Sequence, residues 1–324
     1  MANKTISIII PLYNAESFIG KCIESLLEQS YTNWNAIIID DGSTDNSYNK
    51  CLKYIGKDNR FSVIIKNNEG VSITRNRALD LCKGDYVFFL DADDYLLDRE
   101  CLKKLVDLSE GNNLDYIRFE YRAVDANDKY LFNNSNKFLR KKFYYRAIEP
   151  VNYCSKVAMN EFFLCFSFFK NSIIQHNNIR FIEHCRMRED ADFIIRYLYY
   201  CNNVMYIPEE FYAYRKHDSA ATSKSNINKY DDDLKLVFDS LYNTFQTSNN
   251  KYFNIFLSKF LSLIAYENKK SKYKDYYNDI VDRFPIVNFK YRMYRNAGLI
   301  GKTYNYFEPL IHRIHKRILQ IKNA

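Results

Sequence analysis

The first hundred residues alternate between short apolar runs and longer stretches in which apolar residues recur at helical spacing. The apolar runs predict strands, and the last of them, which is apolar on both faces, predicts a strand buried in the middle of a sheet. They span residues 5–12, 34–39, 61–65 and 86–90. The amphipathic stretches between them predict helices at 16–30, across Tyr48, Leu52 and Ile55, and at 70–82. This alternation predicts a mostly parallel α/β sheet that binds its ligand at the carboxyl ends of its strands.

The strand 86–90 ends abruptly in three carboxylates, Asp91, Asp93 and Asp94. Burial of several like charges is costly, so they should lie just beyond the strand, where open α/β sheets bind ligands. Asp91 and Asp93 are two residues apart and point the same way in an extended chain. Two such carboxylates could hold one divalent cation, which could in turn hold a diphosphate. A solvated acidic turn is the alternative for an isolated pair of this kind.

Composition narrows the class of protein. The chain has 324 residues, of which 47% are hydrophobic and 27% charged, an ordinary globular balance. Eight cysteines occur without a C-x-x-C pair or zinc-finger spacing, which favours reduced, buried thiols and a cytoplasmic protein. No apolar run approaches the ~18–20 residues that span a bilayer, and the first apolar run is too short for a signal peptide and lacks a cleavage region.

The positive charge is concentrated near the end of the chain. Residues 285–324 contribute +7 of the net charge of +8, and the remainder is close to neutral, which argues against a nucleic-acid binder. Within 310–321, four isoleucines fall on one helical stripe, with Arg313, Lys316 and Arg317 towards the other faces. Such a helix could lie on an anionic membrane surface and make the protein peripheral on the inner face of the plasma membrane. Alternatively, it packs its isoleucines on the domain.

Six motifs occur in order along the chain. They are IIIPLYN at 8–14, IIIDDGSTD at 37–45, TRNRAL at 74–79, GDYVFFLDADD at 84–94, RMREDADF at 186–193 and FYAYRKHDSAATS at 211–223. The glycine patterns of dinucleotide-binding and P-loop proteins are missing from the sequence. Together the six motifs resemble the family 2 glycosyltransferases, which have a GT-A fold. The resemblance is continuous over the first hundred residues and resumes in the last two motifs.

The resemblance implies a domain order. Residues 1–224 would form the GT-A domain, with a nucleotide-sugar-binding half at 1–105 and an acceptor-side half at 106–224 that includes a strand at 114–124 and a dense apolar segment at 162–169. Beyond Ser225 the residue pattern itself becomes helical and predicts a smaller C-terminal helical region at 225–324, with helices at 230–245 and 252–266 and a boundary near 222–228.

The resemblance also implies a donor site. Its residues are Pro11, Tyr13, Asn14, Asp41, Arg75, Asp91 and Arg215. Tyr13 would pack against the base, and Asp41 would accept its imide N–H, a role that discriminates uracil from cytosine. Asp91 would approach the ribose. Arg75 would neutralise phosphate or orient Asp91, and Arg215 would neutralise the leaving group. The alternatives are a helix-capping turn for Asp41 and a solvated helix face for Arg75.

A metal and a base complete the implied site. Asp93 would bind Mn²⁺ or Mg²⁺, and His217 would complete its shell or contact the diphosphate, unless it is only a surface histidine. Asp190 would be the catalytic base, with Glu189 beside it to hydrogen-bond the acceptor. Asp192 and Glu183 are weaker candidates, and part of this acidic cluster could simply stabilise a helix start.

One base without a second nucleophile implies single displacement with inversion at the sugar carbon. The implied function moves a sugar from a UDP-linked nucleotide-sugar donor to a saccharide acceptor on a lipid carrier, with no nucleic-acid partner. A nucleotidyltransferase of similar fold and a non-catalytic nucleotide-sugar-binding module are the alternatives.

Overall fold

The computed structural model describes residues 4–134, 140–158, 161–217, 230–245 and 272–282. The chain divides into two compact units, Met1–Asn249 and Asn250–Ala324. The first unit contains the sheet and the candidate site, and its described residues include all eight cysteines as buried free thiols.

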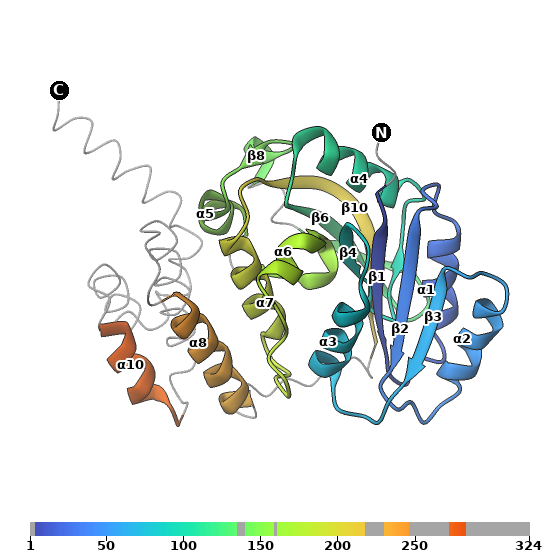
Figure 1. Ribbon diagram of the computed structural model, residues 1–324, viewed down its shortest axis with the longest axis horizontal. Helices are drawn as coiled ribbons and strands as arrows, with labels where there is room; N and C mark the ends of the chain where they lie inside the picture. The colour runs from blue at the N-terminus through green and yellow to red at the C-terminus, as the bar shows by residue number, and fades with distance from the viewer. Residues whose placement is uncertain (1–3, 135–139, 159–160, 218–229, 246–271, 283–324) are drawn as a thin grey trace. The chain divides into compact units, whose positions relative to one another are not determined.

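One sheet runs through the first unit in the order β3-β2-β1-β4-β9-β6-β10-β5 (Figure 1). Its strands are β1 (Ile6–Leu12), β2 (Trp34–Asp40), β3 (Phe61–Ile65), β4 (Tyr86–Phe89), β5 (Tyr95–Leu96), β6 (Tyr116–Asp125), β9 (Ser167–Lys170) and β10 (Val204–Lys216). Two further strands lie off this path: β7 (Tyr130–Asn133) pairs with β6, and β8 (Ala147–Ile148) pairs with β10.

The predicted fold class is confirmed, and its parallel part is the nucleotide-binding half. Strands β3, β2, β1 and β4 are parallel neighbours. Beyond β4 the sheet becomes mixed, because β9 runs antiparallel to both β4 and β6. The predicted apolar segment 162–169 supplies this strand, whose direction the local pattern did not specify.

Helices link and cover the strands. They are α1 (Ile19–Leu27), α2 (Ser47–Ile55), α3 (Val71–Leu81), α4 (Cys101–Asn112), α5 (Pro150–Tyr153), α6 (Asn171–His176) and α7 (Glu189–Tyr199), with a π-helix, η2 (Cys154–Ala158), and a 3₁₀ turn, η3 (Leu164–Phe166). Helix α1 is shorter than predicted, because the N–H groups of Phe18 and Ile19 bond the carbonyl of Ala15 and form a turn before it. Helix α3 packs on β1 and β2 and begins after Gly70, whose φ of 94° suits glycine.

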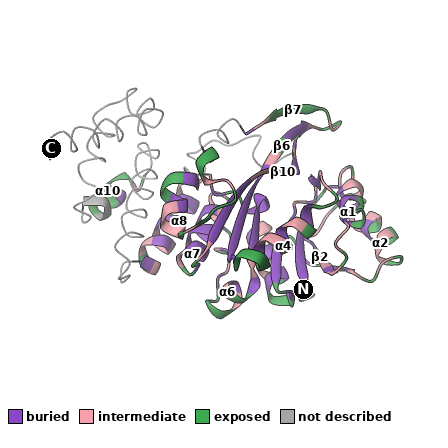
Figure 2. Cartoon of the chain, turned by 90° about the horizontal axis from the view of Figure 1, so that it is seen from above, coloured by how far each residue is buried: buried purple, intermediate pink, exposed green. Residues whose placement is uncertain are grey.

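The core lies along the strands. Figure 2 shows the central strands almost wholly buried, whereas β7 is largely exposed. Every residue of β1 is buried except Pro11. The carboxyl ends of β1, β2 and β4 lead into polar loops, and these loops form the edge of the sheet at which the candidate site lies.

Helix α8 (Asp231–Phe245) belongs to the first unit and packs on α7. The rings of Phe245 and Tyr199 lie 4.8 Å apart, and the Arg186 N–H donates to Asp233 at 3.1 Å. These contacts place α8 with the sheet domain, whereas the sequence interpretation began a separate helical region at 225. The predicted boundary at 222–228 itself lies outside the described residues.

The second unit is described only in part. Its described helix is α10 (Lys274–Asp282). The predicted helix 252–266 and the basic stripe 310–321 lie outside the described residues. Among the helices that the structure does describe, none is both long and apolar enough to cross a membrane.

Candidate active site

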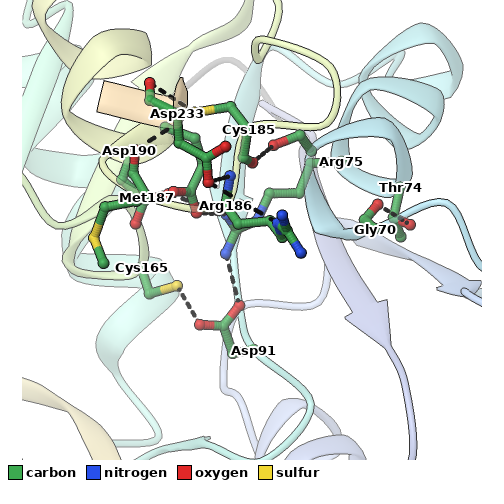
Figure 3. Close-up of polar contacts among 12 residues, drawn as sticks. Gly70, Thr74, Arg75, Asp91, Cys165, Cys185, Arg186, Met187, Asp190 and Asp233 are labelled. Carbon is green, nitrogen blue, oxygen red and sulfur yellow. Dashed lines mark hydrogen bonds and ion pairs between the residues drawn. The ribbon is translucent and has the colours of Figure 1, made fainter. Parts of the chain in front are cut away.

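Arg75 of α3 lies at the centre of the candidate site (Figure 3). Its side chain is only 6% exposed. One terminal nitrogen, Nη2, donates to Asp91 at 3.2 Å. The other, Nη1, donates to Asp190 at 3.0 Å and to Glu189 at 3.3 Å. The buried guanidinium therefore joins the carboxylate after β4 to the two carboxylates that begin α7, an arrangement suited to orienting Asp91.

Asp190 and Glu189 occupy the first turn of α7, which begins after Arg188 in the left-handed conformation. Burial raises the pKa of Asp190 to about 7. The charge of Arg75 opposes this rise, and the charges of Glu189 and Asp91 add to it. A carboxyl group with this pKa can exchange a proton near neutral pH, as a general base must.

The weaker base candidates lie in different surroundings. Asp192 is fully buried and pairs with Arg196 one turn later on α7, a contact that supports the helix. Glu183 is exposed before the helix, as is His184. The carboxylates that the structure brings around Arg75 are thus those of Asp91, Glu189 and Asp190.

The turn η3 adds a contact that the sequence did not reveal. The Cys165 thiol donates to the second carboxylate oxygen of Asp91 at 3.1 Å. Asp91 is therefore held from both sides, by Arg75 and by Cys165. A cysteine within an apolar run is typical of a buried core residue, so no local signal marked Cys165 as part of the site.

Asp93 and His217 form the second cluster. The His217 Nε2 lies 2.9 Å from an oxygen of Asp93, and its ring lies 4.7 Å from that of Phe18. Burial, and next the charge of Asp91, raise the pKa of Asp93. A nearby cation would offset both effects, so the electrostatics of Asp93 favour binding of a positive charge.

Arg215 braces the turn that carries Asp93. It is 3% exposed, and its Nε donates to the Asp93 carbonyl at 2.8 Å. Its Nη1 pairs with Asp128 at 2.5 Å, and its backbone N–H donates to the buried Asp94 at 2.7 Å. Arg215 thus contacts the turn at 91–94 through the Asp93 carbonyl and the buried Asp94 side chain. The Arg215 guanidinium is enclosed by protein.

The protein side chains at this cluster supply only part of the ligand shell of a divalent cation. The described residues contain no group of three or more His, Cys, Asp and Glu side chains arranged to hold a metal. Asp93 and His217 offer two ligands. Mg²⁺ typically takes one or two protein ligands and completes its shell with substrate phosphates and water. The pair therefore fits a cation that arrives with a diphosphate better than one held by protein alone.

The loops after β1 and β2 hold the remaining donor-site candidates. Tyr13 is 51% exposed, which leaves its ring open to a ligand. Pro11 is half-buried within β1, opposite Ile39. The side chain of Asn14 accepts from the Thr44 N–H at 2.8 Å, so Asn14 ties the two loops together.

Asp41 is buried and already has three donors. It pairs with Lys66, which is also buried. It also accepts from the N–H groups of Glu69 and Gly70, each at 2.9 Å. These bonds hold the loop before α3 against the end of β2. A carboxylate has about four acceptor positions, so three of them are occupied here, and the bond to a base stays a prediction.

Replacement of Arg75 by methionine should lower the free energy of unfolding by about 3 kcal/mol, the lower end for a buried ion pair that loses one partner. We take the lower end because its partners Asp91 and Asp190 are 32% and 28% exposed and remain partly screened. Chemical denaturation measures the change.

The matched control is Arg122→Met. Arg122 pairs with Glu210 at 3.2 Å and is 45% exposed, so its loss should cost within about 1 kcal/mol. Equal destabilisation by the two substitutions would show that the Arg75 network does not stabilise the site.

Comparisons with known proteins identify the family of this chain. The model of Glycosyl transferase family 2 matches residues 7–189. The putative glycosyltransferase EpsH of Bacillus subtilis is 27% identical over 78% of this chain and 72% of its own length. The poly(ribitol-phosphate) beta-N-acetylglucosaminyltransferase TarP of Staphylococcus aureus is 28% identical over 84% of this chain and 85% of its own.

Solved structures show the same fold. The crystal structure of S. aureus TarS 1–349 in complex with UDP-GlcNAc superposes with a TM-score of 0.68 at 20% identity, over 83% of this chain and 75% of that one. The mannosyltransferase PcManGT from Pyrobaculum calidifontis, in complex with GDP-Man and Mn²⁺, gives 0.56 at 13% identity, over 94% and 87%. The matched range includes Asp91 and Glu189 and ends one residue before Asp190, the third carboxylate bonded to Arg75. Because the family model covers more than half of the residues, we conclude that this chain belongs to glycosyl transferase family 2.

Proposed function

We propose that this protein is a metal-dependent, inverting glycosyltransferase that moves a sugar from a UDP-linked donor to a saccharide acceptor. The observation that carries the proposal is the Arg75 network, which joins Asp91 at the end of β4 to Asp190 at the start of α7. It holds a candidate donor ligand and a candidate base in one rigid unit. A base with a pKa of about 7, held close to the nucleotide side, suits attack on a bound sugar nucleotide.

The proposed reaction is a single displacement. Asp190 accepts the proton of the acceptor hydroxyl while the hydroxyl oxygen forms a bond to the anomeric carbon of the donor sugar. The bond between that carbon and the diphosphate breaks on the opposite face. Glu189 hydrogen-bonds the acceptor, and Asp91 holds the ribose. Asp93 and His217 would hold Mn²⁺ or Mg²⁺, which neutralises charge on the departing diphosphate.

The choice of donor rests on chemistry and on relatives. The Asp41 carboxylate can only accept hydrogen bonds, and the imide N–H of uracil needs an acceptor. The exposed ring of Tyr13 can stack on the base. The TarS complex contains UDP-GlcNAc, which supports a UDP-sugar. The PcManGT complex contains GDP-Man, so the test must include guanosine donors.

The acceptor is proposed to be a saccharide carried on a lipid at the inner face of the plasma membrane. The basic isoleucine stripe at 310–321 supports this location. The stripe lies outside the residues that the structure describes.

A panel of nucleotide sugars tests the function. With Mn²⁺ or Mg²⁺, one donor at ~100 times its Kd should raise the melting temperature by roughly 5–10 °C and be hydrolysed slowly to the nucleoside diphosphate and free sugar. Differential scanning fluorimetry and chromatography of the products measure the two effects.

Each alternative has its own signature once UTP and a sugar phosphate are added to the panel. A nucleotidyltransferase would release pyrophosphate from UTP and a sugar phosphate. A non-catalytic binding module would give the thermal shift without hydrolysis. Absence of a shift with every donor would contradict the proposal.

A further inference from the structure

An aromatic strip lies on one face of the acceptor-side half, and the proposed reaction does not use it. We define it as Tyr121 of β6, Tyr212 and Tyr214 of β10, Phe166 of η3, and Phe163 just before η3. The register between β6 and β10 shifts at Glu210, and beyond the shift Tyr121 lies opposite Tyr212. Directly opposed side chains share a sheet face, and Tyr214 shares it two residues later. The irregularity thus gathers three tyrosines on the face that η3 covers.

The rings of the strip are in continuous contact. Phe166 stacks on Tyr121 with centroids 4.4 Å apart and an interplanar angle of 17°. The same ring lies 5.0 Å from Tyr212 and 5.5 Å from Phe163, and Tyr121 lies 6.0 Å from Tyr214. These separations are those of favourable aromatic pairs. Packing therefore holds the rings in place before any ligand arrives.

A buried cation supports the strip. The guanidinium of Arg118 lies 5.1 Å from the ring centre of Phe166 and 5.8 Å from that of Phe163. Arg118 is 2% exposed, and its Nη1 donates to the Phe166 carbonyl at 3.4 Å. The charge is thus engaged with the rings and backbone of the strip and is not presented to solvent.

The strip begins at the reaction centre. The Tyr212 hydroxyl accepts from the Asp91 N–H at 3.1 Å. Between Phe163 and Phe166 lies Cys165, which donates to Asp91, and Asp91 shares the Arg75 guanidinium with Asp190. Whatever molecule presents its hydroxyl to Asp190 therefore has this strip beside it.

The strip also opens outward from that centre. Tyr212 is fully buried, Tyr121 and Tyr214 are half-buried, and Phe163 is 41% exposed. Exposure of a large aromatic ring to water is unfavourable in free energy. Exposed aromatic surface beside a reaction centre is typical of a binding surface.

The chemistry of the strip selects among acceptors. A pyranose ring has an apolar face of C–H bonds that can lie on the negative face of an aromatic ring, while its hydroxyls stay in water. A polyol-phosphate chain lacks such a face and needs cations. Here the Arg118 cation is buried under the rings, and Glu161 near Tyr121 is paired with Arg140 at 2.6 Å. A polyanion would therefore meet apolar rings, with the Arg118 charge held beneath them.

We propose that the aromatic strip binds sugar rings of the acceptor, and that the acceptor is an oligosaccharide of pyranose units, not a polyol-phosphate chain. This inference rests on the proposed function, since it takes Asp190 as the base. In this respect the chain would differ from TarP, whose name specifies poly(ribitol-phosphate).

Saturation-transfer NMR tests the proposal with three probes: cellotetraose, chitotetraose and a ribitol-phosphate tetramer. The full-length protein should transfer saturation to the ring C–H protons of at least one pyranose tetrasaccharide and bind it more tightly than the ribitol phosphate. Phe163→Leu keeps the apolar volume and removes the aromatic face, so the apparent affinity should fall about three- to tenfold. Phe163→Tyr should retain it.

Tyr200→Leu is the matched control, because Tyr200 is 40% exposed at the end of α7 and is not part of the strip. It should bind as the wild type does, and melting temperatures confirm that each variant is folded. Binding of neither pyranose probe, equal binding by Phe163→Leu, or preference for the ribitol phosphate would overturn the proposal.

Donor hydrolysis by the wild-type protein separates the two proposals. If a donor is hydrolysed and no tetrasaccharide binds, the strip proposal alone is wrong. If a tetrasaccharide binds through Phe163 and no donor binds, the strip is a saccharide site and the proposed transferase function is wrong.

Discussion

Replacement of Asp190 by asparagine should lower the transfer rate about 10²–10⁴-fold and leave donor affinity nearly unchanged. Asparagine has the shape of aspartate but cannot accept the proton. Its side-chain oxygen can still accept the bond that Arg75 now donates at 3.0 Å, so the network should keep its geometry. Single-turnover release of nucleoside diphosphate measures the rate, and calorimetry measures donor binding.

Glu189→Gln is the paired control. Glu189 accepts from the same Arg75 nitrogen at 3.3 Å and lies one residue earlier. It should affect acceptor affinity more than the rate of the chemical step. If Glu189→Gln loses the rate and Asp190→Asn does not, the two roles are exchanged. If neither loses it, the base lies elsewhere.

The pH profile gives a second readout for Asp190. Its pKa is raised to about 7, mainly by burial, so below that pH the carboxyl group is protonated and cannot act as a base. The kcat/KM of the wild type should therefore fall about tenfold per pH unit below ~7 and level off above it. The residual activity of Asp190→Asn should show no such step, and an identical step in the variant would assign the titration to another group.

Replacement of Asp93 by alanine should lower metal-dependent donor turnover by more than about 10²-fold, because a bound metal ion supplies several kcal/mol of charge stabilisation. Its side chain is 31% exposed and contacts His217, so the fold should persist. Chelation of the wild type with EDTA should have the same effect, and added Mn²⁺ or Mg²⁺ should restore the wild type only.

Asp85 provides a matched control at the other end of the same strand. It precedes β4, pairs with Lys4 at 3.1 Å and is 41% exposed. Asp85→Ala should retain full turnover. Full turnover of Asp93→Ala, or of the wild type in EDTA, would refute the metal-dependent mechanism.

Local patterns predicted the nucleotide-binding half closely. The run 61–65 is β3 as predicted, and 34–39 became β2 with one added residue. Strand β2 is almost wholly buried, whereas Ser62 and Ile65 of the edge strand β3 are exposed, so the apolar pattern identified both strands but not the exposure of the edge strand. The helix 70–82 became α3 because Gly70 supplies the positive φ before it. Helix ends without such a signal, as at 16–30, were less accurate.

The sequence alone also determined the family, because six motifs in order identify it without any knowledge of distances. It marked Asp91, Asp93 and Asp190 as chemical candidates, because the six motifs assign a role to each, although an acid at a helix start such as Asp190 also has a structural use. It could not show that Asp94, in the same motif as Asp93, turns inward to hold the backbone of Arg215.

Only the tertiary structure decided how these candidates meet. Arg75, Asp91, Cys165 and Asp190 come from four separate segments, and their bonds depend on the path of the whole chain across the sheet. The antiparallel direction of β9 brings η3 beside β4 and so places Cys165 against Asp91. Local periodicity carries information on burial and on the type of element. The direction in which a strand joins a sheet, and the side chains that it then brings together, depend on contacts between residues far apart in the sequence.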